Sequence, residues 1–399
     1  MKKFNRRNFL LTGAAGAATV FTAGKAPYRM LNTRRNDRSV LYRTLGKTGI
    51  KIPVVSMGVM RADNPSLVKA AYQNGIEHFD TANGYQGGRN ELMLGKIFSN
   101  YPRESFTVAT KVKPAGVDRR TGLAGEETTA EDFMDKFEES MERLRLEYVD
   151  ILYLHAVSSV EMANHKEITD VMKKLKEEGR VRFIGISTHS NEPEVIDAMV
   201  EAGFWDVVLT RYNFSLNYLD KLEASISRAA KAGIGIVAMK TMAGGYLDKE
   251  KTKPVNTKAA LKWSLQNKNI HTTIPGMTSF DMLDEDLEVM SDIRMSEEEK
   301  KDILISANET GLFCTTCENC LDKCSRSLPV PDLMRAYMYA YGYSERQKAY
   351  DLLAELETGS DPCADCNDCT IDNCTKAFDI RSKITDISRL VNVPREFIS

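Results

Sequence analysis

The segment VDILYLHAVSSVEMANHKEITDVMKKLKEEGRVRFIGIST (residues 149–188) places two short apolar runs on either side of an amphipathic stretch. The runs VDILYLH (149–155) and RFIGIST (182–188) have the length and residue types of buried strands. Between them, ITDVMKKLKEEGR (168–180) repeats apolar residues at three-and-four spacing and ends near a glycine, as helices often do. The segment therefore predicts a strand–helix–strand unit, the building block of a parallel sheet.

The same pattern repeats along most of the chain. Six further apolar runs alternate with helical stretches: VVSMGVM (54–60), HFDTA (78–82), FTVATKV (106–112), DVVLTRYN (206–213), GIVAMKTM (235–242) and HTTIPGM (271–277). Eight such units predict a (β/α)8 TIM barrel, whose typical size is ~250 residues. A doubly wound sheet is the alternative, but no strand carries the G-x-G-x-x-G turn of its dinucleotide-binding form. Ahead of the first unit, LYRTLGKTGIKIP (41–53) predicts a small hairpin.

Composition and patterning set the domain organisation. A hydrophobic content of 42% and a charged content of 28% are typical of a globular protein, and a net charge of −2 gives no basic face for nucleic acid. No apolar run approaches the ~20 residues of a bilayer span, so no stable membrane span is expected. We assign residues 40–294 to the barrel and 295–399 to a mainly helical C-terminal domain, which begins with MSEEEKKDILISANETG.

The N-terminal segment MKKFNRRNFLLTGAAGAATVFTAGKA has the features of an export signal. It combines a basic start, the pair Arg6-Arg7, a run of apolar and small residues, and a cleavage site near Ala23-Gly24. We predict a twin-arginine signal peptide over 1–24 and a polar linker over 25–39. The predicted partner is the twin-arginine export machinery and the predicted location is the periplasm. A mildly hydrophobic tail on a cytoplasmic protein is the alternative.

Ionisable residues stand where three neighbouring predicted strands end. Asp80 ends the second strand, Lys111 the third and His155 the fourth, and Tyr85 lies in the loop after Asp80. Chemistry in a TIM barrel takes place at this carboxyl end of the strands. An ammonium beside a tyrosine would lower the tyrosine's pKa, and a carboxylate would hold the ammonium in place. Each residue alone is more often a loop ion pair or a satisfied polar group, but together they predict a general acid for carbonyl reduction.

The motifs FDTANGYQGGRNELMLGK, ATKV and DILYLH resemble the aldo-keto reductases over roughly residues 40–290. The resemblance implies that the barrel binds NADP or NAD and exchanges hydride with a small-molecule carbonyl substrate. It also implies that Asp80, Tyr85, Lys111 and His155 form the catalytic tetrad, in which the tyrosine protonates the carbonyl oxygen.

The same resemblance implies three cofactor-binding segments, which are GIST (185–188), VAMKTMAGG (237–245) and TIPGMTSFDMLDEDL (273–287). Within them we assign cofactor binding to Ser187, Thr188, Met239, Lys240, Gly276, Thr278, Ser279 and Glu285. Backbone amides of residues 276–279 at a helix N-terminus are suited to phosphate. Several positions depart from the family pattern. Thr188 replaces an Asn, Leu209 a Gln, Met239 a Tyr, Met282 an Arg or Gln, and Asp286 an Asn. The choice between NADP and NAD therefore stays open.

All eight cysteines lie in two runs, CTTCENCLDKC (314–324) and CADCNDCTIDNC (363–374). Disulfides and zinc are alternatives, but neither needs triplets at two-residue spacing, and such triplets resemble the bacterial two-cluster ferredoxin motif. That resemblance implies two 4Fe-4S clusters with an exchanged fourth ligand. The two implied sets are Cys314, Cys317 and Cys320 with Cys374, and Cys363, Cys366 and Cys369 with Cys324. Ser325 and Thr375 stand where ferredoxins usually have proline.

The sequence as a whole resembles a bacterial subgroup of aldo-keto reductases with a ferredoxin-like domain and a twin-arginine signal. This resemblance implies an NAD(P)-dependent oxidoreductase whose iron–sulfur clusters transfer electrons, with a redox protein as a further partner. Export by the twin-arginine route fits, since that route carries proteins already folded around their clusters. The alternative is a non-catalytic or nicotinamide-independent iron–sulfur electron-transfer protein built on the same barrel.

Overall fold

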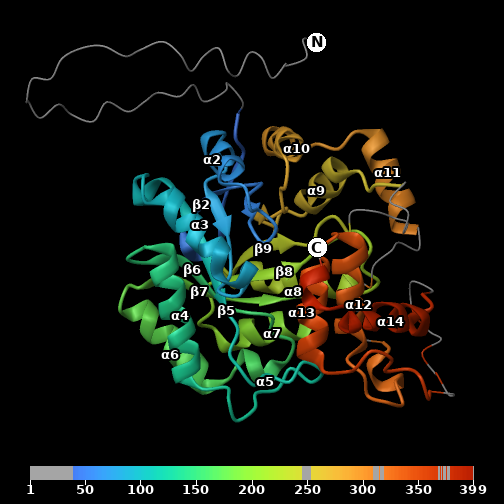
Figure 1. Ribbon diagram of the computed structural model, residues 1–399. Helices are drawn as coiled ribbons and strands as arrows, with labels where there is room; N and C mark the ends of the chain where they lie inside the picture. Colours follow the sequence, from blue (N-terminus) through green and yellow to red (C-terminus); the bar gives the residue numbers. More distant parts are fainter. Residues whose placement is uncertain are drawn as a thin grey trace, which may run out of the picture. The chain divides into compact units, whose positions relative to one another are not determined.

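The computed structural model describes residues 39–244, 253–308, 314, 319–366, 369, 371, 374 and 378–398 (Figure 1). The signal peptide predicted over 1–24, most of the linker predicted over 25–39, and Cys317 lie outside these described residues.

Eight parallel strands form the central sheet: β3 (Met57–Gly58), β4 (His78–Asp80), β5 (Thr107–Val112), β6 (Val149–Leu154), β7 (Val181–Thr188), β8 (Val207–Arg211), β9 (Gly235–Met239) and β10 (Thr272–Thr273). They pair in chain order from β3 to β10. Parallel bridges from Val55 to Thr273 and from Gly58 to Gly276 then bring the two edges of the sheet together. Each strand overlaps one of the eight predicted apolar runs, and the predicted (β/α)8 barrel is confirmed.

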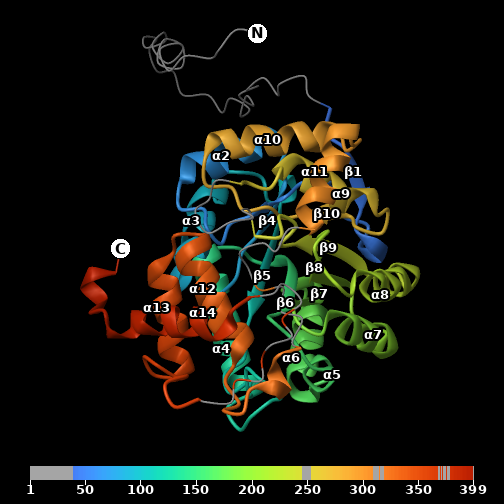
Figure 2. The same ribbon diagram turned by 90° about the vertical axis from the view of Figure 1, so that its right-hand side faces the viewer.

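Helices surround the strands: α2 (Pro65–Gln73), α3 (Arg89–Phe98), α4 (Ala130–Leu144), α5 (Val160–Ala163), α6 (Lys166–Glu177), α7 (Glu192–Ala202), α8 (Leu219–Lys231), α9 (Thr257–Gln266) and α10 (Phe280–Ser291). In α4, Phe133, Phe137 and Met141 recur every fourth residue and are buried against the strands. The Thr129 side chain caps this helix by accepting a hydrogen bond from the Asp132 amide. Figure 2 shows α10 beside α2 and α9, which it contacts.

The predicted hairpin closes one end of the barrel. Strands β1 (Tyr42–Thr44) and β2 (Lys51–Pro53) are antiparallel, and the short helix η1 (Gly46–Thr48) lies between them. Leu45 and Ile52 are fully buried in the cluster that fills the barrel interior. The Lys47 amide donates to Gly233 O at 2.7 Å, just before β9 begins. The hairpin therefore covers the amino-terminal end of the strands and leaves the carboxyl end for the functional site.

Helix α11 (Glu297–Asn308) packs against the barrel helix α9, as Figure 1 shows. Lys262 Nζ lies 2.7 Å from Glu299 Oε1, and Asn256 donates to Asp302 Oδ2 at 2.8 Å. Ile303 is buried in one cluster with residues of α9. The sequence places α11 in the C-terminal domain, and the contacts described here join it to the barrel helix α9.

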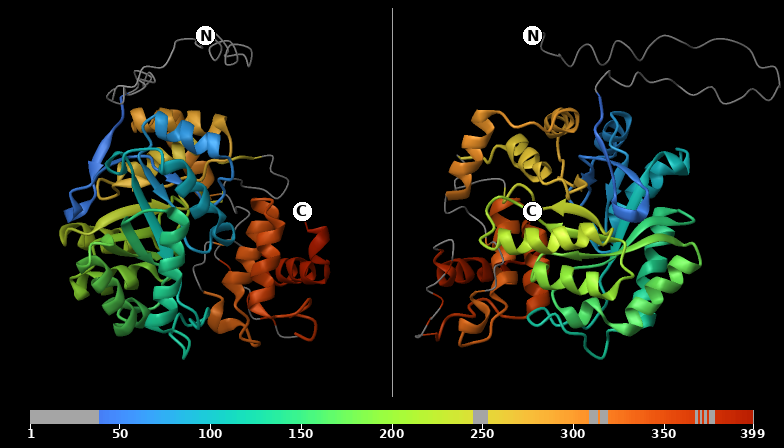
Figure 3. Two further views of the ribbon diagram at one scale, coloured as in Figure 1. Left: turned by 60° about the vertical axis from the view of Figure 1, so that its left-hand side comes forward. Right: turned by 180° about the vertical axis from the view of Figure 1, so that it is seen from behind.

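The C-terminal helices form a group with its own core (Figure 3). They are α12 (Val330–Tyr337), α13 (Arg346–Leu356) and α14 (Ile380–Ser388), with the π-helix η5 (Met338–Gly342) and the short 3-10 helices η4 (Leu321–Lys323), η6 (Arg389–Asn392) and η7 (Arg395–Phe397). Leu333, Tyr337, Leu353 and Ile384 are among their buried side chains. Every element described beyond residue 295 is helical, as the sequence predicts for this domain.

The C-terminal helices contact loops at the carboxyl end of the barrel strands. Arg61, which follows β3, places its Nε 2.6 Å from Glu345 Oε1 and donates to the carbonyl of Tyr343 at 3.1 Å. His189, which follows β7, has its Nδ1 3.3 Å from Arg335 Nη2. The C-terminal domain therefore lies next to the end of the barrel where chemistry is expected. Among the helices that the structure describes, none combines the length and apolar character needed to cross a membrane.

Candidate functional site

The structure brings the four predicted catalytic residues together at the carboxyl end of the barrel. Asp80 is the last residue of β4, Lys111 is the penultimate residue of β5, and His155 directly follows β6. Tyr85 begins the short helix η2 (Tyr85–Gly88) after β4. Since β4, β5 and β6 are adjacent and parallel, their ends meet at one edge.

The ammonium of Lys111 is the centre of this group. Its Nζ donates to the carboxylate of Asp80, to the carbonyl oxygen of Thr81 at 2.6 Å and to the hydroxyl of Tyr85 at 3.3 Å. These three contacts match the three donors of an ammonium. Lys111 and Asp80 are only 1% and 2% exposed. The lysine is thus fixed in position, with one donor aimed at the phenol oxygen.

The charge state of the group follows from burial and from these contacts. Burial alone would lower the pKa of Lys111, but Asp80 and Tyr85 together raise it by more than burial lowers it. The pKa is therefore raised overall, and the lysine is a cation at neutral pH. Burial raises the pKa of Tyr85, and the opposing effect of Lys111 is smaller. We had expected a lowered pKa for Tyr85; the lysine acts in that direction, but burial outweighs it. Tyr85 is therefore a protonated phenol at neutral pH, as a proton donor must be.

His155 stands beside the tyrosine as a neutral imidazole. Its ring centroid lies 5.9 Å from that of Tyr85, with the planes at 79°. Burial holds the pKa of His155 well below its ordinary value, and the positive charges of Lys111, Lys113, Lys348 and Arg335 lower it further. A neutral imidazole can donate one hydrogen bond to a carbonyl oxygen while leaving the proton transfer to the phenol.

The nicotinamide segments lie on the strands β7, β8 and β9. Ser187 Oγ accepts a hydrogen bond from the Ala156 amide at 2.9 Å, and Thr188 Oγ1 donates to the carbonyl of Ser190 at 2.9 Å. Both residues are buried. Leu209, at the position of the family's glutamine, is fully buried in the cluster that fills the barrel interior. These side chains therefore offer fewer free polar groups than the family pattern implies.

The loop after β9 carries the next two predicted cofactor residues. Met239 ends β9 and packs against the interior cluster. Lys240 follows with a positive φ of 55°, and its carbonyl accepts from Asn213 Nδ2 at 3.0 Å. Burial holds the pKa of Lys240 well below its ordinary value, and Arg335 and Arg211 lower it further. An anion bound nearby would raise this pKa and favour the ammonium form.

The predicted phosphate segment lies at the N-terminus of α10. Ser279 caps this twelve-residue helix by accepting from the Met282 amide at 3.2 Å, and Gly276 and Thr278 are exposed just before it. Glu285 Oε2 accepts a hydrogen bond from Thr257 Oγ1 at 2.7 Å. A helix N-terminus favours a phosphate through its free amides and its dipole. Met282, which is 42% exposed, supplies no cation beside it.

Asp286 stands where the family has asparagine. Its surroundings keep the side chain neutral, as an asparagine side chain is. The side chain is 4% exposed, and burial, followed by the charge of Glu285, raises its pKa to about 8. At neutral pH the group is therefore largely a neutral carboxylic acid, which can both donate and accept hydrogen bonds, as an amide does.

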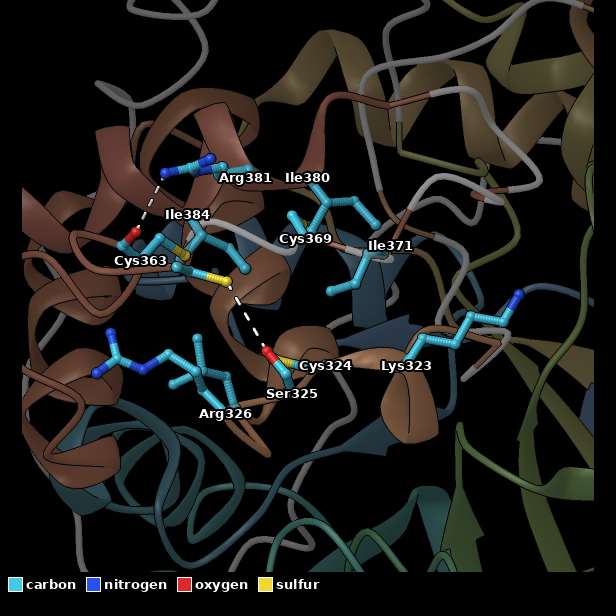
Figure 4. A pocket seen from close by; sticks show the side chains of 12 residues that line it. Lys323, Cys324, Ser325, Arg326, Cys363, Cys369, Ile371, Ile380, Arg381 and Ile384 are labelled. Atoms are coloured by element: carbon cyan, nitrogen blue, oxygen red, sulfur yellow. Dashed lines mark hydrogen bonds between the residues drawn. The ribbon is translucent and has the colours of Figure 1, made fainter.

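Four cysteines from the two motifs line one cavity (Figure 4). Cys324 comes from the first motif, and Cys363, Cys366 and Cys369 come from the second. The cavity has an empty volume of about 370 Å³, open mouth included, and its apolar lining comes from Leu328, Ile371, Ile380 and Ile384. Burial raises the pKa of the Cys363 thiol, and the other three cysteines raise it further because they are close. This is one of the two sets that the exchanged ferredoxin pattern implies.

The second implied set is described in part. Cys314, Cys320 and Cys374 are half-buried and pack against the C-terminal core, whereas Cys317 lies outside the described residues. Cys314 is one of the groups that raise the pKa of Arg211, the last residue of β8. All seven cysteines that the structure describes are free of disulfides. Within the described residues, no three His, Cys, Asp or Glu side chains form a group that could hold a single metal ion.

Sequence reasoning missed the residues that the C-terminal domain brings to this site. Lys348 Nζ, from α13, lies 5.9 Å from the ring centroid of Tyr85 and 4.6 Å from that of Tyr339. Arg335, from α12, contacts His189. These residues are more than 140 positions away in the chain from the barrel residues they approach, so no local motif could have indicated them.

A parallel barrel with a tyrosine, lysine, aspartate and histidine at its carboxyl end has the architecture of an oxidoreductase acting on carbonyl groups. The family model described as Aldo/keto reductase family matches residues 56–258. The L-galactose dehydrogenase of Arabidopsis thaliana is 30% identical over 291 residues, which cover 63% of this chain and 88% of that protein. The chain belongs to the aldo/keto reductase family, whose members are oxidoreductases that usually use NAD or NADP.

Two further comparisons agree. The L-glyceraldehyde 3-phosphate reductase of Escherichia coli K12 is 29% identical over 225 residues, covering 52% of this chain and 62% of that protein. The solved structure of the aldo-keto reductase AKR11C1 from Bacillus halodurans, in its holo form, matches with a TM-score of 0.56 at 20% identity. It covers 68% of this chain and 97% of that one, and shows the shared fold.

Asp286→Asn should make the protein more stable at alkaline pH. In the folded state the pKa of Asp286 is about 8, above the ordinary value of 3.8. At a pH between these two values, the folded protein keeps a proton on Asp286 that the unfolded protein has lost. The wild type therefore loses stability as pH rises from about 4 to about 8. At pH 8 the variant should melt at least about 2–4 °C higher, and the difference should shrink toward pH 5. Thermal unfolding followed by circular dichroism measures this.

The exposed Asp284 of the same helix provides the control. Asp284→Asn should shift the melting temperature little at either pH. A difference between wild type and Asp286→Asn that stays constant from pH 5 to pH 8 would contradict the buried, protonated carboxyl.

Proposed function

We propose that this protein is an NAD(P)-dependent aldo-keto reductase that interconverts a small-molecule carbonyl and its alcohol. The observation that carries the proposal is the buried Lys111 ammonium, which is held by Asp80 and Thr81 and donates to the hydroxyl of Tyr85. Two relatives are named for sugar-like substrates, galactose and glyceraldehyde 3-phosphate, so hydroxylated aldehydes are the first compounds to test.

The proposed mechanism assigns the proton to Tyr85. A bound nicotinamide would supply hydride to the carbonyl carbon. The phenol of Tyr85 gives its proton to the carbonyl oxygen, and the nearby Lys111 ammonium stabilises the phenolate that forms. Asp80 keeps the lysine charged and in place. The neutral His155 donates a hydrogen bond that orients the carbonyl oxygen, and the alcohol is oxidised by the reverse steps.

The residues that would hold the nucleotide are Ser187, Thr188, Met239 and Lys240 toward the nicotinamide, and Gly276, Thr278, Ser279 and Glu285 toward the phosphates. The exposed amides before α10 fit a phosphate, and the neutral Asp286 fits the amide it replaces. Among the residues that the structure describes, no carboxylate forms an ion pair with Lys240, so an anionic group of the nucleotide could pair with it. No cation accompanies these amides at Met282, so we leave NADP and NAD as equal candidates.

We also propose that the cysteine motifs hold two 4Fe-4S clusters. Supporting this, Cys324, Cys363, Cys366 and Cys369 share one apolar cavity although they come from separate motifs. Their grouping follows the exchanged ferredoxin pattern, and thiolates in an apolar shell are the usual ligands of such clusters. The clusters would carry single electrons to or from a redox protein. Cys314, Cys317, Cys320 and Cys374 would hold the other cluster.

Export by the twin-arginine route and a periplasmic location complete the proposal. The support is the basic start, the Arg6-Arg7 pair and the small-residue run of the N-terminal segment. Folding around clusters before export would require a route that carries folded proteins.

Tyr85→Phe should abolish most turnover while keeping the ring. The variant lacks the transferable proton, so turnover should fall by roughly 10²–10⁴ with nucleotide affinity nearly unchanged. Lys111→Met should cause a similar loss and move the alkaline limb of alcohol oxidation to higher pH, because the ammonium partly opposes the raised pKa of Tyr85. NAD(P)H oxidation with a panel of aldehydes, ketones and quinones measures both variants.

Tyr72→Phe is the matched control, since the Tyr72 hydroxyl bonds to Ser105 in a different part of the barrel. Full activity in Tyr85→Phe would remove the tetrad from the mechanism. If the wild type oxidises neither NADPH nor NADH with any member of the panel, the barrel is the non-catalytic alternative.

Anaerobically purified protein should contain about eight iron and eight sulfide per chain, the content of two 4Fe-4S clusters. Cys324→Ser and Cys363→Ser should each remove one cluster, and the double variant should lose no more than either single one. Combining Cys324→Ser with Cys314→Ser should remove both clusters. Iron analysis and electron paramagnetic resonance of the reduced protein measure the loss, with Ser382→Ala, at an exposed position outside the cavity, as the control. Stoichiometric zinc, or independent losses in Cys324→Ser and Cys363→Ser, would contradict the assignment.

Replacing Arg6-Arg7 by Lys-Lys should keep the protein in the cytoplasm, because the export machinery recognises the arginine pair. Cell fractionation and immunoblotting of wild type and variant measure this. Changing the nearby pair Lys2-Lys3 to Arg-Arg is the control and should leave export intact. A wild type found wholly in the cytoplasm of its own host would refute the signal.

A further inference from the structure

Cationic side chains outnumber carboxylates around Tyr85 and His155. Arg61 pairs with Glu345 at 2.6 Å, Arg335 pairs with Asp332 at 3.0 Å, and Lys111 pairs with Asp80. Two further lysines stand beside this group. The His155 amide donates to the carbonyl of Val112, the residue before Lys113, at 2.9 Å, and Lys348 Nζ lies 5.9 Å from the centroid of the Tyr85 ring. Both lysines lower the pKa of His155. Among these described side chains, five cations accompany three carboxylates, an excess of two positive charges.

Lys348 is one source of this excess. It comes from α13 of the C-terminal domain, and its side chain is 34% exposed. Its nearest carboxylate oxygen, on Glu345, is 3.8 Å away, and the other oxygen of that group is already bound by Arg61. The ammonium lies over the rings of Tyr339 and Tyr85, at 4.6 and 5.9 Å from their centroids. An ammonium held by aromatic faces keeps donors available for another group.

Lys113 is the second source. It follows β5 by one residue and is half-buried, and no carboxylate among the described residues lies within ion-pair distance of it. Burial lowers its pKa to about 8; Arg119 and Arg335 lower it too, while Asp332 and Glu355 act the other way. A half-buried ammonium without a partner is costly unless an anion joins it. An anion bound beside Lys113 would offset this cost.

We propose that Lys113 and Lys348 bind an anionic group, a carboxylate or phosphate, on the substrate whose carbonyl oxygen faces Tyr85 and His155. This inference rests on the proposed function and names its substrate class. The segment assigned to the nucleotide phosphates follows β10, whereas Lys113 follows β5 and Lys348 lies over Tyr85. The two lysines would therefore contact the substrate and not the nucleotide phosphates. Lys348 is supplied by the C-terminal domain.

Two aldehydes that differ in one charge test the proposal. The value of kcat/KM is measured with NADPH and with NADH for 4-carboxybenzaldehyde and for its neutral methyl ester, methyl 4-formylbenzoate. The wild type should favour the carboxylate. Lys113→Met and Lys348→Met should each reduce that preference by about 10- to 100-fold, since a charge-assisted hydrogen bond is lost. The loss should appear mainly in KM for the carboxylate, with the nucleotide Kd unchanged.

Lys166→Met is the matched control, because that lysine is 88% exposed on α6; it should leave the preference unchanged. Lys113→Arg and Lys348→Arg should restore part of it. Equal kcat/KM for the two aldehydes in the wild type, or equal losses on both in the Met variants, would overturn the anionic subsite while leaving the reductase intact.

Binding without turnover separates this inference from the proposed function. Calorimetry compares 4-(hydroxymethyl)benzoate with its methyl ester on the wild type and the two Met variants. Tighter binding of the carboxylate, lost in both variants, would support the subsite even in a protein that reduces neither aldehyde. Indistinguishable binding of the two compounds to the wild type would overturn it.

Discussion

The buried ammonium of Lys111 is the constraint on which the site depends. Removing a charge from water costs free energy unless partners replace the lost solvation, and here three partners do so. Asp80 must end β4, the Thr81 carbonyl must turn toward β5, and the Tyr85 hydroxyl must come within 3.3 Å. Adjacent parallel strands make this geometry available, because the ends of β4 and β5 meet at one edge. The fold and the proposed acid–base chemistry thus depend on the same interaction.

The C-terminal domain changes what surrounds that interaction. Its helices contact loops that follow β3 and β7, through Arg61 and His189, so the domain is part of the surroundings of the tetrad. Burial already makes the pKa of His155 low, and Lys348 and Arg335 of this domain lower it further. An imidazole kept neutral in this way cannot compete with Tyr85 as the acid. The domain that contains the cysteine motifs therefore also helps to set the protonation states at the barrel.

Sequence patterns predicted the parts of this structure that depend on local periodicity. The eight strands and the tetrad followed from apolar runs and from the polar residues at their ends. The net pKa of Tyr85 could not be predicted, because the balance between burial and a neighbouring charge needs the packed structure. The contact between α11 and α9 and the position of Lys348 depend on long-range packing, which no short motif encodes. The grouping of Cys324 with the second motif was predicted from the resemblance to ferredoxins, because the spacing of the cysteines alone does not determine it.

The departures from the family pattern have different physical consequences. Leu209 fills the barrel interior, so the polar contact of the family's glutamine is lost there. Asp286 keeps its hydrogen-bonding capacity, because burial leaves it protonated at neutral pH. The amides before α10 do not depend on side-chain identity at all. Substitutions that look equally disruptive in a sequence therefore differ in effect. Contacts made by the backbone or by a neutral acid survive, and those made by a lost side-chain amide or cation do not. The proposed phosphate end of the site therefore keeps more of the family pattern than the proposed nicotinamide end.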